Sequence, residues 1–319
     1  MTGTALRVAF AGLAHSHPYT DAGNVRALGA EVVGVHDADA RAAEDFALRF
    51  GGAVVASAGD LSTLRPDLVI ATPHPHEVGA FLRALGDGTA PVFVNKVIAA
   101  TALQLAEVDR AVADSSVRLG TSSVLRFAPA VRALAAEISA GPAAATVCAL
   151  RVHAQHDNAA FRLPSRAWQD DPHSGGGTLA TVGVHGWEML DALLPGAALV
   201  AGSGWTRTRD GSATASEDAA GIDGLLRVPG AARDVPVQML VTGAPGPDAY
   251  AVDVVTTTGI RSIVIGGDDG DANEELGFAG LIRALLDAAP RAVTVAPWDR
   301  ARVVVANTIR GAEIARGAA

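Results

Sequence analysis

The sequence of 319 residues contains one cysteine, Cys148, so it can form no internal disulfide and no cysteine-rich metal site. It has no run of about 20 apolar residues, which a membrane-spanning helix needs. It also has no lysine and arginine cluster, and its net charge is −9, which argues against nucleic acid or an acidic membrane as the main partner. Without a signal-peptide pattern, the sequence predicts a soluble, cytoplasmic protein.

Apolar residues are plentiful and charged residues are few. The chain is 49% hydrophobic and 18% charged, which is typical of a compact folded protein. Its length suits two domains rather than one ordinary core. The single cysteine stands in a strand-like segment, so we expect Cys148 to be a buried, inert thiol.

The first third of the chain alternates short strand-like runs with helical ones. The pattern predicts strands at 7–11, 31–36, 54–55, 68–71, 92–94 and 117–120, with helices at 40–50, 77–85 and 101–113 and a further helix entered through Pro18. Repeated units of this length indicate a doubly wound parallel sheet with right-handed crossovers. We therefore expect an α/β Rossmann domain over residues 1–124.

From residue 125 the pattern changes. A helix at 130–139 and a strand at 144–155 precede long strands separated by tight turns, at 199–208, 219–228, 235–242, 249–257 and 260–265, and helices are expected at 274–288 and 298–316. These segments predict a second, α+β domain over residues 125–319, with a large open sheet that is mainly antiparallel.

The loop after the first strand reads Gly12-Leu13-Ala14-His15-Ser16-His17. A dinucleotide fingerprint would place glycines at positions 12, 14 and 17, and only Gly12 is present. The helix that starts near Pro18 can nevertheless attract phosphate through its free N–H groups and its dipole. We expect Gly12, Leu13, Ala14 and His15 to contact a nucleotide.

Asp37 ends the second strand, about 20 residues beyond this loop, where a carboxylate binds a ribose 2′-hydroxyl in dinucleotide-binding folds. Its charge would repel a 2′-phosphate, so Asp37 favours NAD over NADP. The alternative is an aspartate that only forms a turn or caps a helix.

Further polar residues follow the fourth and fifth strands, at Thr72-Pro73-His74-Pro75-His76 and Asn95-Lys96. Ligands of doubly wound sheets bind at this carboxyl edge. Lys96 stands between apolar runs, so we expect it in a crevice, where a lysine can polarise a carbonyl or an alkoxide.

The histidines of the first domain allow a different interpretation. Two follow the first strand and two follow the fourth, and those strands are neighbours in the usual order. The four imidazoles could therefore converge on a metal ion; they are His15, His17, His74 and His76. Loop and cofactor contacts explain the same residues without a metal.

The second domain contains a glycine run, Gly175-Gly176-Gly177, that leads into an apolar helix. Helical spacing places Thr181, His185 and Glu188 on one stripe, and His185 is a candidate proton-transfer group. The alternative is a histidine hydrogen-bonded inside a helix–sheet interface. Trp168, just before the run, either lines the nicotinamide or substrate site or packs in the core.

Six segments in chain order resemble the glucose–fructose oxidoreductase / inositol dehydrogenase / MocA-like (Gfo/Idh/MocA) family. They cover nearly the whole chain and are Arg7–His17, Val32–Asp37, Ala71-Thr72-Pro73 with His76, Asn95-Lys96-Val97 in the place of the family's Glu-Lys-Pro, Arg126-Phe127-Ala128-Pro129, and Gly175 through His185. The resemblance implies NAD(P)-dependent oxidation or reduction of sugars, inositols and related polyols. It also implies a terminal helix over 298–316 that packs back on the first domain, and a homo-oligomer, dimer or tetramer, built through the open sheet face.

The family's catalytic set is usually a lysine, an aspartate and a histidine. Lys96 and His185 match two of these, while Thr181 stands where the family has the aspartate, four residues before the histidine. Thr72, Pro73, His76, Asn95 and Lys96 match the family's cofactor-binding positions. Because Thr181 carries no charge, His185 lacks the carboxylate that would orient it, and Glu188 is a candidate to restore part of that charge. Two functions follow, a divergent dehydrogenase or a nucleotide- or sugar-binding relative without redox turnover.

Overall fold

The structure is a computed structural model that describes residues 5–86, 90–140, 146–212, 214–266 and 271–317. The chain forms two compact units, each built from two stretches of sequence. The first contains Met1–Ser122 and Phe278–Ala301, and the second contains Ser123–Gly277 and Arg302–Ala319.

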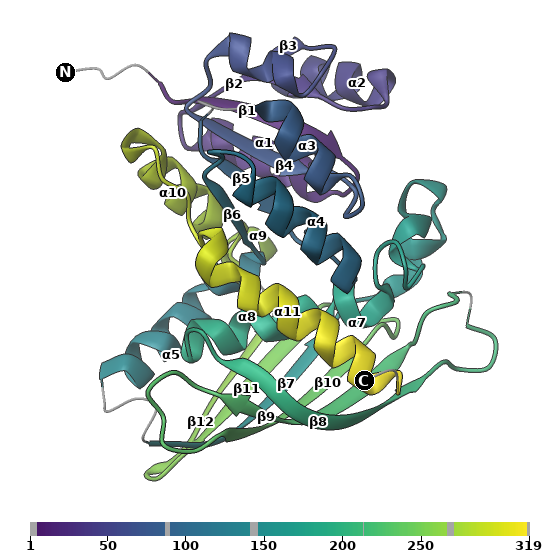
Figure 1. Cartoon of the computed structure of the whole chain (residues 1–319), viewed down its shortest axis with the longest axis vertical. Helices are drawn as coiled ribbons and strands as arrows, with labels where there is room; N and C mark the ends of the chain where they lie inside the picture. Colours follow the sequence, from purple (N-terminus) through teal and green to yellow (C-terminus); the bar gives the residue numbers. More distant parts are fainter. Residues whose placement is uncertain (1–4, 87–89, 141–145, 213, 267–270, 318–319) are drawn as a thin grey trace. The chain divides into compact units, whose positions relative to one another are not determined.

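The first unit is built on a six-stranded parallel sheet (Figure 1). Its strands are β1 (Arg7–Leu13), β2 (Glu31–His36), β3 (Ala53–Val54), β4 (Leu68–Thr72), β5 (Val92–Asn95) and β6 (Leu119–Ser122). They lie in the order β3-β2-β1-β4-β5-β6, and every neighbouring pair is parallel. The strand order reverses between β1 and β4, and ligands of such sheets bind beyond the carboxyl ends of the strands at this point.

Helices α1 (His17–Ala27), α2 (Ala40–Phe50), α3 (Val78–Leu85) and α4 (Ala102–Ala113) connect the strands. Local chemistry sets their ends. The Asp39 side chain accepts hydrogen bonds from the N–H groups of Arg41 and Ala42 at the start of α2. Thr101 caps α4 in the same way through the Gln104 N–H. Parallel strands covered on both faces need continuous apolar sequence, and β1, β4 and β5 are buried along most of their length.

A segment from near the end of the chain completes the first unit. It contains α10 (Phe278–Ala288) and the first turn of α11 (Trp298–Ala315). Pro297 forms a bridge with Gly120 beside β6, and the Trp298 indole N–H donates to Asp109 Oδ1 at 3.1 Å. The Phe278 ring meets the His17 ring edge-on, with centroids 5.0 Å apart.

The second unit is built on another six-stranded sheet. Its strands are β7 (Val147–Gln155), β8 (Ala198–Arg207), β9 (Ala219–Arg227), β10 (Val235–Thr242), β11 (Ala249–Thr256) and β12 (Gly259–Gly266), in the order β12-β11-β7-β10-β9-β8. All neighbours are antiparallel except β7 and β10, which run parallel. The predicted mainly antiparallel sheet is confirmed.

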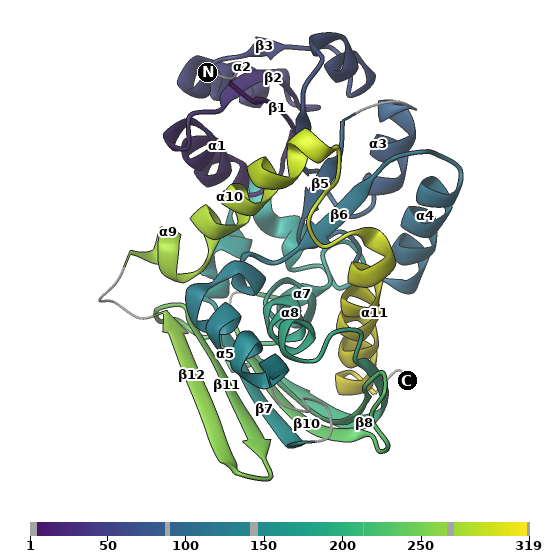
Figure 2. The same cartoon turned by 90° about the vertical axis from the view of Figure 1, so that its left-hand side faces the viewer.

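Helices cover one face of this sheet and leave the other face open (Figure 2). The covering helices are α5 (Pro129–Ala140), α7 (Gly177–Thr181), α8 (Gly183–Leu193) and the part of α11 from Arg302 onward. Alternate residues of the strands form the core beneath them, including Val152, Ile222, Met239 and Val252.

Two predicted helices are each broken in the structure. The helix expected to carry Thr181, His185 and Glu188 is two helices, α7 and α8, which meet at Val182, so the predicted single stripe is interrupted. At this junction the His185 N–H donates to Val182 O, three residues back, in place of the four-residue bond of an α-helix. The helix expected over 274–288 is divided into α9 (Ala272–Glu275) and α10 at Gly277.

Two smaller expectations differ as well. Cys148 is exposed on β7, so the prediction of a buried thiol is wrong: it takes an outward position near the beginning of its strand. β6 begins at Leu119 rather than at residue 117. The expected strand over 144–155 starts outside the described residues, and β7 begins at Val147.

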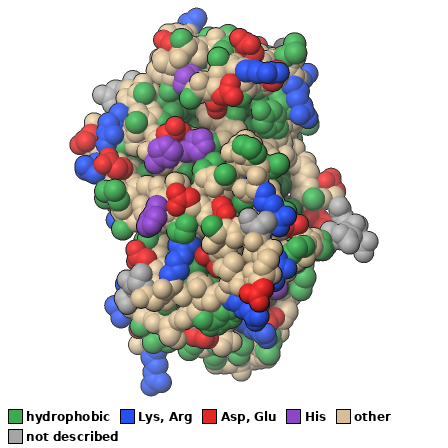
Figure 3. Space-filling model, turned by 90° about the vertical axis from the view of Figure 1, so that its right-hand side faces the viewer, with side chains coloured by type: hydrophobic (Ala, Val, Ile, Leu, Met, Phe, Trp, Pro, Cys, Tyr) green, Lys and Arg blue, Asp and Glu red, His purple; other side chains and the backbone are tan. Residues whose placement is uncertain are grey.

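Within the part of the chain that the structure describes, none of the helices combines the length and the apolar character needed to span a bilayer. On the face shown in Figure 3, acidic and basic side chains are interspersed among hydrophobic ones.

Candidate active site

The corner after β1 requires glycine. Gly12 has φ +70°, and a Cβ built there would lie 2.6 Å from the Pro73 backbone nitrogen. The Ala14 N–H donates to Thr72 O at 3.3 Å, which ties this loop to the one after β4. The structure thus brings together four of the predicted cofactor residues, Gly12, Ala14, Thr72 and Pro73.

Two imidazole rings lie in the part of the loop that includes position 17, where the fingerprint would have its third glycine. The rings of His15 and His17 meet edge-on with centroids 4.3 Å apart, and both side chains are buried. α1 begins at His17 with Pro18 in its first turn, and the N-cap residue Ser16 makes no side-chain cap. The His15 ring instead accepts the His17 N–H at 3.4 Å at this end of α1, where the helix dipole favours an anion.

Asp37 holds the same loop through hydrogen bonds. Its Oδ2 accepts the Leu13 N–H at 2.5 Å, and its Oδ1 accepts the Asp39 N–H at 2.8 Å. The turn-forming role considered for Asp37 is therefore present. Each carboxylate oxygen has a second lone pair with which to bind a ribose hydroxyl, so this role does not exclude the other.

A buried polar cluster lies at the carboxyl edge of the sheet. The Asn95 Nδ2 donates to Asp21 Oδ2 at 2.8 Å and to Thr72 Oγ1 at 3.3 Å. Asp21 is fully buried, and burial raises its pKa to about 7, although the hydrogen bond from Asn95 lowers it. Asp21 Oδ1 and Asn95 Oδ1 are buried without a hydrogen-bond partner.

Asp21 was not among the residues predicted from the sequence, although a signal for it exists. His17, Asp21 and Asn24 follow the spacing of one helical stripe, and all three are buried on α1. Three polar residues on the buried stripe of a helix that packs on a sheet indicate a polar site beneath that helix.

Lys96 follows β5 directly and is only 9% exposed. The Lys96–Val97 peptide bond is cis, and the next four residues, 97–100, are all buried. The lysine is thus held in an apolar segment at the same sheet edge as Asn95.

The other two of the four candidate metal-binding histidines, His74 and His76, lie beside an acidic side chain. His74 Nδ1 lies 3.1 Å from Glu77 Oε2, and the exposed His76 has its Nε2 3.8 Å from Glu77 Oε1. In the described residues, no three His, Cys, Asp or Glu side chains are grouped as a metal site would need. The structure shows the four histidines as two separate contacts, His15 with His17 and His74 with His76.

In the second unit, His185 is buried on α8. Its Nδ1 lies 2.5 Å from Ser123 Oγ, and its ring centroid lies 5.2 Å from that of Tyr250. Thr181, at the end of α7, donates its hydroxyl proton to Gly177 O at 2.8 Å. Ser123 and Tyr250 were not predicted, because they are far from His185 in the sequence and no local motif marks them.

Glu188 is bound to an arginine. The Arg126 guanidinium donates from Nε to Glu188 Oε2 at 2.7 Å and from Nη2 to Asp191 Oδ2. Burial opposes the charged form of Arg126, but the two carboxylates outweigh it and raise the arginine's pKa. The Glu188 charge is thus balanced by Arg126, which weakens its candidacy as the missing charge beside His185.

The glycine run is a second tight corner. Gly177 has φ +67°, and a Cβ there would lie 2.9 Å from Arg316 Nη2. Arg316 Nη2 donates to Gly176 O at 2.7 Å and to Glu217 Oε1, which also accepts the Leu179 N–H at 2.7 Å. The carboxylate thereby satisfies a free N–H at the start of α7.

Trp168 packs against the start of this run. A Cβ at Gly175 would lie 2.5 Å from Trp168 O and 2.8 Å from its ring, so the glycine allows the close approach. The tryptophan is half-buried.

No protein-family model matches the chain, and no curated protein matches its sequence. Solved structures do match. GenD2 from gentamicin A biosynthesis, in complex with NAD, is 20% identical with a TM-score of 0.79, and the match covers 100% of this chain and 95% of that one. The chain shares the fold of such proteins. Two others are apo scyllo-inositol dehydrogenase from Lactobacillus casei (13% identical, TM-score 0.77, 99% and 98% covered) and a myo-inositol dehydrogenase from Corynebacterium glutamicum (14% identical, TM-score 0.76, 98% and 97% covered). The predicted fold class, a Rossmann sheet with a second α+β domain, is confirmed.

Proposed function

We propose that the protein is an NAD-dependent oxidoreductase of the Gfo/Idh/MocA family that acts on a sugar, inositol or related polyol, or on its keto form. The whole-chain fold match to a protein solved with NAD carries this proposal, because it includes both units. In it, residues 1–124 bind the nucleotide and residues 125–319 bind the substrate. The other matches named above, both inositol dehydrogenases, support the class of substrate.

The first unit has the features that a dinucleotide needs. Gly12 keeps the corner free of side-chain atoms where a pyrophosphate would approach, and the start of α1 presents the positive end of its helix dipole. Asp37 favours NAD over NADP because its carboxylate would repel a 2′-phosphate. The remaining residues proposed to hold the cofactor are Leu13, Ala14, His15, Thr72, Pro73, His76, Asn95 and Lys96.

The residues named above would hold the nicotinamide, which would supply hydride exchange with a substrate carbon. His185 would take the proton of the substrate hydroxyl, or return it in the reverse reaction. Lys96 would stabilise the negative charge that develops on the oxygen, through its ammonium group. Thr181 and Trp168 would contact the substrate without taking part in proton transfer.

One observation favours a second function, the binding of a nucleotide or sugar without turnover. Thr181 replaces the aspartate of the family's catalytic set, and its hydroxyl is bonded to Gly177 O. An aspartate at this position would make the histidine a stronger base for the oxidation step, and a threonine cannot.

Titration with NADH and with NADPH separates these functions. We expect NADH to bind at least tenfold more tightly than NADPH, and a panel of polyols and keto-sugars to give turnover with at least one member. Tight NADH binding without turnover on the panel would favour the binding function. Binding of neither nucleotide would contradict both the cofactor and the oxidoreductase.

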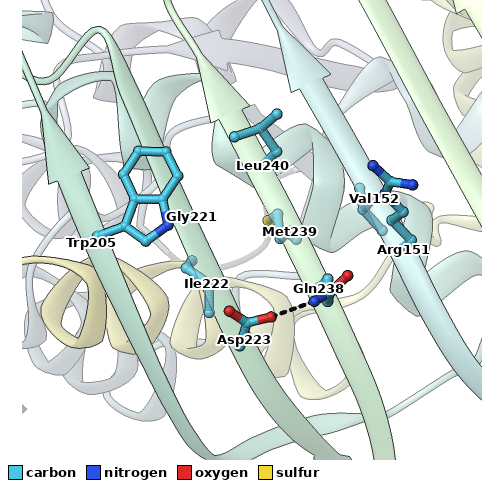
Figure 4. A pocket seen from close by; sticks show the side chains of 9 residues that line it. All are labelled: Arg151, Val152, Trp205, Gly221, Ile222, Asp223, Gln238, Met239 and Leu240. Atoms are coloured by element: carbon cyan, nitrogen blue, oxygen red, sulfur yellow. Dashed lines mark hydrogen bonds between the residues drawn. The ribbon is translucent and has the colours of Figure 1, made fainter.

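We also propose that the protein is a cytoplasmic homo-oligomer, a dimer or tetramer, joined through the open face of the second sheet. Apolar side chains are exposed there, among them Trp205, Leu240 and Val264. A depression on this face lies between Trp205 and Leu240 over Gly221, with Asp223 and Gln238 hydrogen-bonded at its side (Figure 4). Light scattering should show a dimer or tetramer that Leu240→Lys dissociates, whereas a monomeric wild-type protein would contradict the proposal.

A further inference from the structure

His185 is held from one side by a hydroxyl group. The distance from its Nδ1 to Ser123 Oγ is 2.5 Å, and both residues are at most 5% exposed. Ser123 itself is fixed, because its Oγ also accepts the Leu125 N–H at 3.2 Å at the start of the short helix Val124–Phe127. With Nδ1 engaged in this bond, Nε2 is the ring nitrogen that the proposed function assigns to the substrate.

The imidazole also contacts an aromatic ring. The Tyr250 ring lies against it at an interplanar angle of 54°, and Tyr250 is 3% exposed. Burial and the nearby Asp248 raise the pKa of the Tyr250 phenol, so it stays neutral. A hydrogen bond and a ring contact together restrict the orientation of His185.

Charged groups on the elements around α8 in the second unit have partners of their own. Arg126, on the segment after Ser123, is bound to Glu188 and Asp191 of α8. Asp248, before β11, lies 2.6 Å from His156. The charged and titratable residues of the other neighbouring elements are exposed or lie on the open face of the sheet; they are Arg132 and Glu137 on α5, Arg151 and His153 on β7, Asp253 on β11, and Arg302, Arg310 and Glu313 on α11.

We propose that Ser123 is a positioning residue that orients His185 through an uncharged hydrogen bond, in place of a carboxylate. This inference rests on the proposed function of His185 as the proton-transfer group. When Nδ1 carries the proton, it donates to Ser123 Oγ, and Nε2 is the basic nitrogen of the ring. In the oxidation direction the substrate hydroxyl proton moves to Nε2, while the hydride and its two electrons go to the oxidised nicotinamide.

An uncharged partner has a consequence that a carboxylate would not have. A carboxylate stabilises the protonated imidazole and moves the acidic limb of a pH–rate profile to higher pH. Ser123 supplies orientation without that stabilisation. His185 should therefore remain a competent base at lower pH than it would beside an aspartate.

The test compares Ser123→Ala and Ser123→Asp with a matched control, Thr308→Ala, which removes another buried hydroxyl that bonds to Val304 O within α11. We expect Ser123→Ala to lower kcat about 10- to 100-fold with little change in KM or in NADH binding. Ser123→Asp should recover activity, with the acidic limb of kcat/KM moved up by about one pH unit. The control should keep the wild-type profile.

A second measurement does not depend on turnover. In ¹⁵N-histidine-labelled protein, the His185 signal, identified by its loss in His185→Asn, should report a single neutral tautomer with the proton on Nδ1. In Ser123→Ala it should become a mixture of the two tautomers. If the tautomer ratio and the pH profile are the same in Ser123→Ala as in wild type, the positioning role is wrong. If the tautomer changes as expected but no substrate turns over, Ser123 orients His185 and the oxidoreductase proposal fails instead.

Discussion

In the first unit the buried carboxyl of Asp21 faces the amide of Asn95, whereas in the second unit the carboxylates of Glu188 and Asp191 face the guanidinium of Arg126. Burial raises the pKa of Asp21 to about 7, and the hydrogen bond from the uncharged Asn95 amide offsets this rise only in part. The Arg126 guanidinium carries a positive charge, so in the second unit Arg126, Glu188 and Asp191 form an ion triad. The comparison shows that an uncharged partner leaves the burial of a carboxyl largely uncompensated, whereas a cation compensates it.

The largest effect is expected from breaking the ion triad. Arg126→Met would leave two buried carboxylates without their cation, and we expect the free energy of unfolding to fall by about 3–5 kcal/mol in urea titrations. Adding Glu188→Gln and Asp191→Asn should restore most of the loss, because no buried charge then remains. An unchanged stability in Arg126→Met would show that the triad is not a stabilising unit.

Replacing Asp21 should change the free energy of unfolding in the opposite direction, and the size of this change should depend on pH. Its folded-state pKa of about 7 lies above the ordinary 3.8, so its stabilising contribution is complete below the lower value and is lost as the pH rises through the higher one. Asp21→Asn should therefore match wild type near pH 4 and be more stable near pH 8, by up to about 4 kcal/mol. Unfolding curves at the two pH values test this, and a difference that does not vary with pH would contradict it.

A smaller difference in stability between the two units is expected at their glycine corners, Gly12 and Gly177. Gly12 and Gly177 have nearly the same φ, +70° and +67°, but an added Cβ would meet the Pro73 backbone in the first case and side chains in the second. Gly12→Ala should lower the stability by about 1–3 kcal/mol and weaken NADH binding. Gly177→Ala should cost less, because the Arg316 side chain can move. Equal losses of stability in the two variants would refute the difference.

Much of this fold could be predicted from the sequence, because the spacing of apolar residues and the residue types of turns are local features of the chain. β2, α2 and β10 begin and end at the predicted residues, and the loop at Gly12 and Asp37 was recognised by its spacing. The parallel pairing of β7 with β10 could not be foreseen, because the pattern of one strand says nothing about its neighbour.

The candidate site was predicted less completely, for the same reason. His185 and Lys96 stand in recognisable segments, but the partner of His185 is 62 residues away and belongs to no motif. Glu188 was a candidate to support His185 until its bond to Arg126 was seen. Side-chain partners at long range depend on packing, which spacing along the chain does not reveal.

Hydride transfer tests the central claim most directly. Purified protein with NAD and a panel of inositols and sugars should show the rise in near-ultraviolet absorbance that marks NADH formation, and His185→Ala should slow it by about 10²- to 10⁴-fold with NADH binding retained. An equal rate in wild type and His185→Ala would contradict the account. So would a panel in which no polyol forms NADH from NAD and no keto-sugar consumes NADH.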